Sequence, residues 1–142
     1  MQFISSSTKQ TFSFAKKFAS QLKGGEILGL VGPLGAGKTV FVKGLAAGLG
    51  IKKKITSPTF VLMKIYPLKL RGKPAIKNLV HLDAYRIKQA KELLAIGVKD
   101  YIGHPDAVTV IEWAEKIKKI LPKKARIIEI KHKTNNIRCI VY

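Results

Sequence analysis

The sequence predicts a single α/β domain, residues 1–142, in which a mixed, mostly parallel β-sheet is flanked by helices and carries antiparallel additions. Three observations support this fold class. Strand-like and helix-like segments alternate along the chain, the short apolar segments at 26–31 and 107–111 are typical of strands buried in a sheet, and two strand-like segments close the chain. At 142 residues and 46% hydrophobic composition, the chain can bury one core but leaves no room for a large second domain.

Capping and turn signals divide the first half of the chain. Ser7 and Gln10 form a capping box, which predicts a helix that begins after Ser7 and ends at Gly24-Gly25. No element is assigned before Ser7. The later elements expected in this half are a strand at 26–31, a helix at 40–49, and strands at 60–66 and 75–82 that flank a turn at 71–74.

The second half continues the alternation of helix and strand. The pattern predicts a helix at 88–96 closed by Gly97, a buried strand at 107–111, and a helix at 114–121 that ends before Pro122. Two last strands, at 125–130 and 137–141, are expected to pair across a polar turn that holds Asn135-Asn136.

A glycine-rich motif lies between the first strand and the second helix. Residues 32–39 read GPLGAGKT and fit G-x-x-x-x-G-K-[ST], a loop whose backbone N–H groups converge on the phosphates of a nucleotide at a helix N-terminus. Strand, loop and helix follow in the order this motif requires, so we expect a P-loop NTPase that binds ATP or GTP. The expected nucleotide contacts in this segment are Gly32, Leu34, Gly35, Ala36, Gly37, Lys38, Thr39 and Val40.

Two of these residues and two acids are candidates for the chemistry. Lys38 is expected to reach the β and γ phosphates, and the Thr39 hydroxyl to face Mg²⁺. Asp83 and Glu112 each end a strand, at the sheet edge where ligands bind in open α/β folds. One acid would hold the metal, directly or through water, and the other would polarise the attacking water. Which acid does which stays open, and either alone could instead cap a helix.

A third polar segment precedes the strand expected at 60–66. Ser57 and Thr59 place hydroxyls on both sides of Pro58, which stiffens the turn. Such a turn is suited to sensing a γ-phosphate and becoming ordered when the phosphate is bound. We therefore add Ser57 and Thr59 to the expected nucleotide contacts.

Four motifs in order resemble those of a known family. HLDAYR at 81–86 looks like an H-x-D-x-Y-R signature, and IEW at 111–113 looks like a hydrophobic-E-W signature. GPLGAGKT and SPTF precede them in the order and at the spacing that these motifs have in the family. Together they resemble the bacterial TsaE (YjeE) family, small ATPases of tRNA threonylcarbamoyladenosine synthesis. The resemblance implies a first switch at 57–59 and places Trp113 in a second switch near the nucleotide. Pro33 and Ala114 depart from the family, which usually has an acid and a proline at these positions.

The resemblance also implies partners. In that family the carbamoyl transfer is carried out by a complex built from TsaB and TsaD, and the TsaE-like chain supplies the ATP binding and hydrolysis that resets this complex. We therefore expect an Mg²⁺-dependent ATPase with low activity when isolated, and an indirect relation to tRNA through the partner complex.

The charge of the chain leaves a direct contact with tRNA open. There are 27 Lys and Arg residues against 8 Asp and Glu residues, a formal net charge of +19, and the window from Ile27 to Leu82 holds no acid. Such a surface attracts nucleic acid, with Lys52, Lys53 and Lys54 as candidates for phosphate contacts. A lysine-rich genome that yields only solvated surface lysines explains the same composition.

The remaining composition narrows the location and the class. No segment is long and apolar enough for a membrane span, no secretory signal is evident, and the lone Cys139 fits a reducing compartment, so we expect a cytoplasmic protein without membrane contact. Cys139 and three scattered His residues give no metal-ligand spacing, so Mg²⁺ with the nucleotide is the metal expected.

Three rival functions share the nucleotide loop. A GTPase needs an N-K-x-D segment, which is absent from the sequence. A small P-loop kinase normally needs a lid and an acceptor-binding insertion, for which the chain has little space. A nucleotide-gated RNA-binding module without significant turnover is the other alternative, although the interleaved aromatics of a stacking platform are missing.

Overall fold

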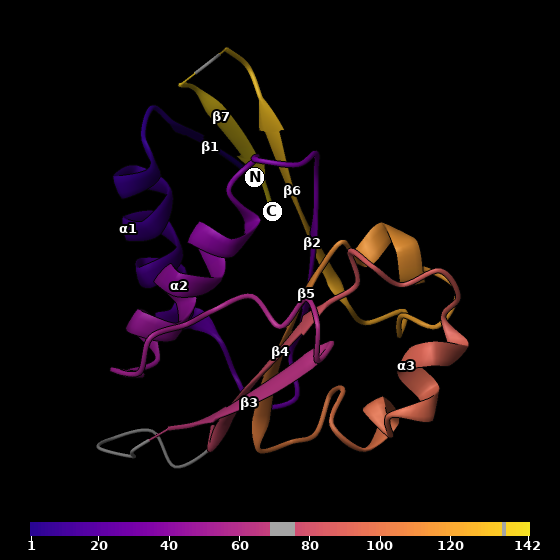
Figure 1. The fold of residues 1–142 in the computed structure, drawn as a ribbon. Helices are drawn as coiled ribbons and strands as arrows, with labels where there is room; N and C mark the ends of the chain where they lie inside the picture. Colours follow the sequence, from indigo (N-terminus) through magenta and orange to yellow (C-terminus); the bar gives the residue numbers. More distant parts are fainter. Residues whose placement is uncertain (69–75, 135) are drawn as a thin grey trace.

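The computed structural model describes residues 1–68, 76–134 and 136–142. They build one sheet of seven strands in the order β1-β7-β6-β2-β5-β4-β3 (Figure 1). The turn expected at 71–74, Ala75 at the start of an expected strand, and Asn135 of the expected hairpin turn lie outside the described residues. The strands are β1 Gln2–Ser5, β2 Ile27–Val31, β3 Met63–Pro67, β4 Asn78–Asp83, β5 Ala107–Glu112, β6 Arg126–His132 and β7 Arg138–Val141.

The centre of the sheet is parallel and its margins are antiparallel. β2 pairs in parallel with β5 and β6, and β4 pairs in parallel with β5. β3, β7 and β1 add antiparallel pairings at the two sides, which confirms the predicted fold class. The register of β4 and β5 sets Asp83 opposite Glu112, so both acids end at the same edge of the sheet.

Helices cover both faces of the sheet. The helices α1 Thr8–Phe18 and α2 Lys38–Gly48 lie together on one face, and the short α3 Lys91–Ala95 lies on the other (Figure 1). α1 and α2 pack with their backbones close, because a Cβ on Gly44 would lie 2.4 Å from the carbonyl oxygen of Phe12 and one on Gly48 would lie 2.3 Å from that of Lys16. The 3-10 turns are η1 Ala19–Gln21, η2 Val98–Asp100 and η3 Ala114–Ile117.

Two hydrophobic clusters form the core, one on each face of the sheet. The first packs α1 and α2 against the sheet around Phe41 and Leu45, and the second packs the α3 and η3 side around Leu93 and Ile117. The second cluster lies beneath a thinner cover of short helical turns. The face of the sheet that carries α1 and α2 is therefore more firmly packed than the face that carries α3 and η3.

The first two corrections to the sequence-based expectations concern strands. β1 was not predicted, and it exists because four residues at the N-terminus find β7 as a partner, with the Met1 amine 2.7 Å from the carbonyl oxygen of Tyr142. β3 begins at Met63, three residues later than expected, because Leu62 has φ 63°, a left-handed conformation that interrupts an extended strand.

The other two corrections concern helices. The helix expected at 88–96 is shortened to α3, since the carboxylate of Glu92 accepts the N–H groups of Lys88 and Gln89 and caps the chain before the helix. Gly97 ends it in the left-handed conformation, as predicted. The helix expected at 114–121 is only the 3-10 turn η3, which follows Trp113 in a left-handed conformation and has no side-chain cap.

Candidate functional site

The glycine-rich loop joins β2 to α2 and has a backbone that only glycine allows at key points. Gly32 has φ 140°, and a Cβ there would lie 2.2 Å from the carbonyl oxygen of Ile130. Gly37 has φ 105° and serves as the N-cap of α2. In the described part of the chain, the backbone N–H groups of Gly35, Gly37 and Lys38 have no acceptor. These donors at a helix N-terminus form a ready anion-binding surface.

Lys38 is folded back on its own loop. Its Nζ donates to the carbonyl oxygens of Gly32 at 2.6 Å and Pro33 at 2.9 Å, and lies 3.6 Å from the centre of the Trp113 ring. Burial lowers the pKa of the Lys38 amine, although the negative charges of Glu115, Glu112 and Asp83 oppose this shift. A buried cation with only neutral hydrogen-bond acceptors is well placed to receive an anion.

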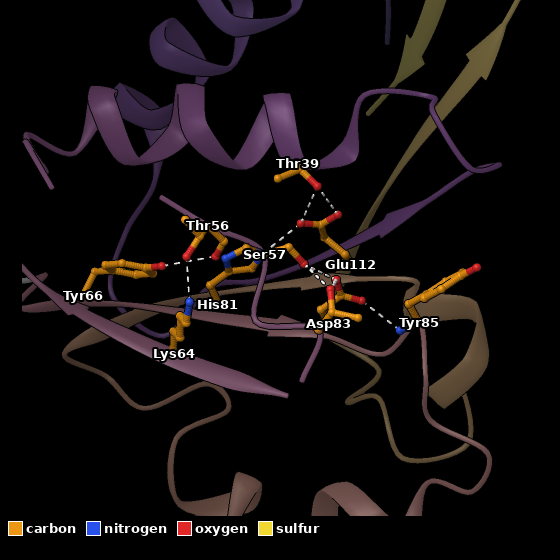
Figure 2. A network of polar contacts seen from close by, with 10 residues as sticks. Thr39, Thr56, Ser57, Lys64, Tyr66, His81, Asp83, Tyr85 and Glu112 are labelled. Carbon is orange, nitrogen blue, oxygen red and sulfur yellow. Dashed lines mark hydrogen bonds and ion pairs between the residues drawn. The ribbon is translucent and has the colours of Figure 1, made fainter. Parts of the chain in front are cut away.

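Glu112 connects the helix α2 to the centre of the sheet. The Thr39 hydroxyl donates to both carboxylate oxygens of Glu112, at 2.8 and 3.1 Å, and Nε2 of His81 lies 2.9 Å from Oε1 (Figure 2). His81 and Glu112 are both buried, and Nδ1 of His81 has no partner among the described residues. With its hydrogen on Nε2, the imidazole of His81 donates to the Glu112 carboxylate.

Asp83 holds the segment that was predicted as a switch. Its Oδ2 accepts the hydroxyls of Ser57 and of Thr59, the latter at 3.1 Å, and its Oδ1 accepts the backbone N–H of Tyr85 at 2.8 Å (Figure 2). The two hydroxyls also lie 2.7 Å from each other. All these contacts converge on one carboxylate at the end of β4.

The aromatic rings of Tyr85 and Trp113 lie next to each other beside Lys38 and Asp83. Trp113 follows Glu112 with φ 60°, a strained conformation for a residue other than glycine, and its ring centre lies 5.1 Å from that of Tyr85. The carbonyl oxygen of Tyr85 accepts a hydrogen bond from Nζ of Lys116. Trp113 is thus in contact with both the loop lysine and the segment that follows Asp83.

A cavity of about 450 Å³ brings these parts together. Of the predicted site residues, only Gly32 is not in its lining, since it lies behind the loop against β6. Sequence reasoning gave no role to Tyr85 or His81, although both belong to the HLDAYR segment that carried the resemblance. The lining consists of Leu34, Gly35, Ala36, Gly37, Lys38, Thr39, Val40, Ser57, Thr59, Asp83, Tyr85, Glu112 and Trp113.

Within the described residues, no group of three or more His, Cys, Asp or Glu side chains could hold a metal ion by itself. Among those same residues, none of the helices has the length and apolar character needed to cross a membrane.

Comparisons with known proteins agree over nearly the whole chain. The family model described as "Threonylcarbamoyl adenosine biosynthesis protein TsaE" matches residues 5–140. Curated proteins named "tRNA threonylcarbamoyladenosine biosynthesis protein TsaE" are similar: the Treponema pallidum protein is 37% identical, covering 92% of this chain and 91% of that protein, and the Bacillus subtilis protein is 38% identical, covering 94% and 79%.

A solved structure shows the same fold. The crystal structure of YdiB from Bacillus subtilis superposes with a TM-score of 0.78 and 32% identity, covering 99% of this chain and 82% of that one. Sequence motifs, family model and fold all agree, and the chain belongs to the TsaE family.

Proposed function

We propose that this chain binds ATP with Mg²⁺ in the cavity at the glycine-rich loop and hydrolyses it as an accessory to threonylcarbamoyladenosine formation in tRNA. One observation carries the proposal: a single cavity gathers the loop, the buried cation Lys38, the Thr39 hydroxyl and two buried carboxylates. The names of the related proteins supply the pathway.

The residues present fit a nucleotide triphosphate. The space around Gly35 is open, since a Cβ there would have no neighbour within 4 Å, and the N–H groups of Gly35, Gly37 and Lys38 have no acceptor in the described part of the chain. Lys38 would exchange the Gly32 and Pro33 carbonyls for phosphate oxygens, which are stronger, charged acceptors.

The hydroxyl of Thr39 and the carboxylate of Glu112 fit Mg²⁺, which prefers oxygen ligands and is usually held by few protein groups with water and phosphate. When bound, Mg²⁺ neutralises charge on the phosphates.

The contacts divide the work between the two acids. Glu112 touches Thr39, so we assign it to the metal side of the cavity, with His81 holding its Oε1. Asp83 touches Ser57 and Thr59, so we assign it to the switch and to orienting the attacking water once these hydroxyls turn to the γ-phosphate. The proposed catalytic residues are Lys38, Asp83 and Glu112.

The size of the cavity at the loop supports an accessory role. A cavity of about 450 Å³ suits a nucleotide, with little left for a second substrate. We propose that a transferase complex like TsaB–TsaD carries out the carbamoyl transfer and that ATP turnover here resets that complex. A cytoplasmic location follows from this role.

Two measurements test the proposal. The first is equilibrium binding of ATP and ADP with and without Mg²⁺ to the wild type, Lys38→Ala and Thr39→Ala, where Lys38→Ala should abolish binding and Thr39→Ala should weaken only the Mg²⁺-dependent part. The second is ATP hydrolysis with and without the partner pair, which we expect to rise strongly when the partners are present. Hydrolysis retained in Lys38→Ala would contradict the site, and activity unaffected by partners would contradict the accessory role.

A further inference from the structure

A second cleft lies next to the start of α3. The helix α3 covers the face of the sheet opposite α1 and α2 (Figure 1). Its volume is about 690 Å³, against about 450 Å³ for the cavity at the loop. Two segments line it, 88–90 before α3 and 115–119 around η3. Its basic residues are Lys88, Lys116, Lys118 and Lys119, and its single acid is Glu115.

The lysines of this cleft outnumber its acids, since four lysines share the lining with Glu115 alone. None of the four forms an ion pair within the described residues. The nearby carboxylate of Glu92 is already engaged by the backbone N–H groups of Lys88 and Gln89. Lys88, Lys118 and Lys119 are exposed, so their ammonium groups are available to an external anion.

The composition of the lining favours a nucleic-acid backbone over a protein as the ligand of this cleft. The cores of protein interfaces are poor in lysine and rich in aromatic residues, whereas lysine is typical of contacts to nucleic-acid phosphates. No aromatic residue lines this cleft, so a bound strand would be held by its backbone and not by stacked bases. We infer that the cleft binds the phosphodiester backbone of RNA. That the RNA is tRNA rests on the proposed function.

A short series of contacts joins this cleft to the nucleotide cavity. Lys116 lines the cleft, and its Nζ donates to the carbonyl oxygen of Tyr85 and lies 5.3 Å from the centre of the Tyr85 ring. Tyr85 in turn contacts Trp113, over which Lys38 lies. A phosphate at Lys116 competes with the Tyr85 carbonyl for the same ammonium group. RNA in the cleft therefore changes the surroundings of Trp113 and the affinity for ATP.

The binding test uses two triple variants of equal charge. Lys88→Gln/Lys118→Gln/Lys119→Gln removes three charges from the cleft, and Lys52→Gln/Lys53→Gln/Lys54→Gln removes three exposed charges that line neither cavity. Affinity for an unmodified tRNA transcript is measured by fluorescence anisotropy across a salt series. We expect the cleft variant to bind roughly 10-fold or more weakly, with a salt slope smaller by about two, and the control to change little.

Several outcomes would overturn the inference. Equal losses in both triple variants would mean a diffuse charge effect, and a flat, weak profile in the wild type would mean that the lysines are solvated bystanders. In Lys38→Ala, which is expected not to bind phosphates at the loop, pyrophosphate that displaces tRNA at equal phosphate concentration would make the cleft a small-anion site. Loss of binding to the transferase partners in the cleft variant, without loss of tRNA binding, would make it a protein interface.

The coupling is tested separately. With saturating tRNA, we expect a shift in Trp113 fluorescence and a several-fold change in ATP affinity in the wild type, and neither in Lys116→Gln, although this variant still binds tRNA through the other lysines. Equal responses in both proteins would overturn the coupling. ATP affinity of the cleft triple variant distinguishes the two proposals. If this variant binds ATP normally and its tRNA affinity does not fall below that of the control variant, the cleft proposal is refuted and the proposed ATPase function stands.

Discussion

The two halves of the cavity at the glycine-rich loop are held by different interactions. In the phosphate-loop half, residues 32–39 with Glu112, the backbone of Gly32 packs against Ile130 and the carboxylate lies buried between Thr39 and His81. In the switch half, residues 56–62 with Asp83, two hydroxyls share one carboxylate oxygen (Figure 2). Beyond them, Phe60 is 82% exposed and Val61 is 59% exposed.

We expect this difference to decide which half responds to a ligand. Moving the phosphate loop means separating backbone from backbone and exposing buried groups, which costs several kcal/mol. Moving the outer part of the switch means exchanging the hydroxyl bonds of Asp83 for bonds to a phosphate, while Phe60 and Val61 are already exposed and Leu62 stays packed against the second cluster. We therefore expect a preformed phosphate site beside a switch that a γ-phosphate reorganises.

The largest effect is expected where the loop is most tightly packed. Gly32→Ala puts a methyl group against the carbonyl oxygen of Ile130 in a left-handed backbone, so stability should fall by roughly 3 kcal/mol or more and nucleotide binding should be lost. Gly35→Ala is the matched control, because its φ is also positive but nothing lies within 4 Å, and about 1 kcal/mol is expected. Urea denaturation compares the stability of the two variants, and similar losses of stability would show that the loop is not preformed by packing.

The second prediction separates the two acids. Asp83→Asn and Glu112→Gln should each lower ATP turnover by about 100-fold or more, with smaller effects on ATP affinity, because both are assigned to the metal, the water or the switch. Glu112→Gln should in addition raise the Mg²⁺ concentration needed, and Asp83→Asn should not. Single-turnover hydrolysis across a Mg²⁺ series measures this, and parallel losses of affinity and rate in both variants would point to structural capping.

The third prediction concerns the support behind Glu112. His81→Leu removes one donor from the carboxylate, and because Nδ1 has no partner among the described residues, no other hydrogen bond is lost. We expect a loss of about 1–3 kcal/mol in stability and a weaker Mg²⁺ dependence of nucleotide binding. His81→Gln, whose amide can donate in place of Nε2, should restore much of that Mg²⁺ dependence. Failure of Gln to rescue while Leu folds normally would remove His81 from the positioning of Glu112.

The smallest effect is spectroscopic. Trp113 lies between Lys38 and Tyr85, so ATP with Mg²⁺ should change its fluorescence, and ADP should change it less because the switch side is not engaged. Trp113 is the only tryptophan in the chain, which makes the signal unambiguous. Identical emission in the free, ADP-bound and ATP-bound protein would leave Trp113 with a packing role alone.

Most of the candidate site was predictable because its parts are local in sequence. The run from Gly32 to Thr39 is a contiguous loop with a fixed spacing, and Asp83 and Glu112 directly follow apolar strand segments. Tyr85 and His81 were missed as site residues, since an aromatic residue and a histidine near a strand end carry no spacing rule of their own. Only the pairing of β4 with β5 places His81 near Glu112.

The sequence by itself determined the α/β class, the loop and its helix, and the ends of the buried strands, because glycine spacing, apolar periodicity and turn residues act over a few neighbours. Tertiary structure decided what depends on a distant partner. β1 exists only because β7 offers its edge, β3 begins late because Leu62 turns out of the strand, and η3 stays short after the left-handed Trp113. Tertiary structure also decided that Asp83 bonds to Ser57 and that Glu112 bonds to Thr39. These hydrogen bonds span 26 and 73 residues of sequence, so they are set by the fold and not by local propensity.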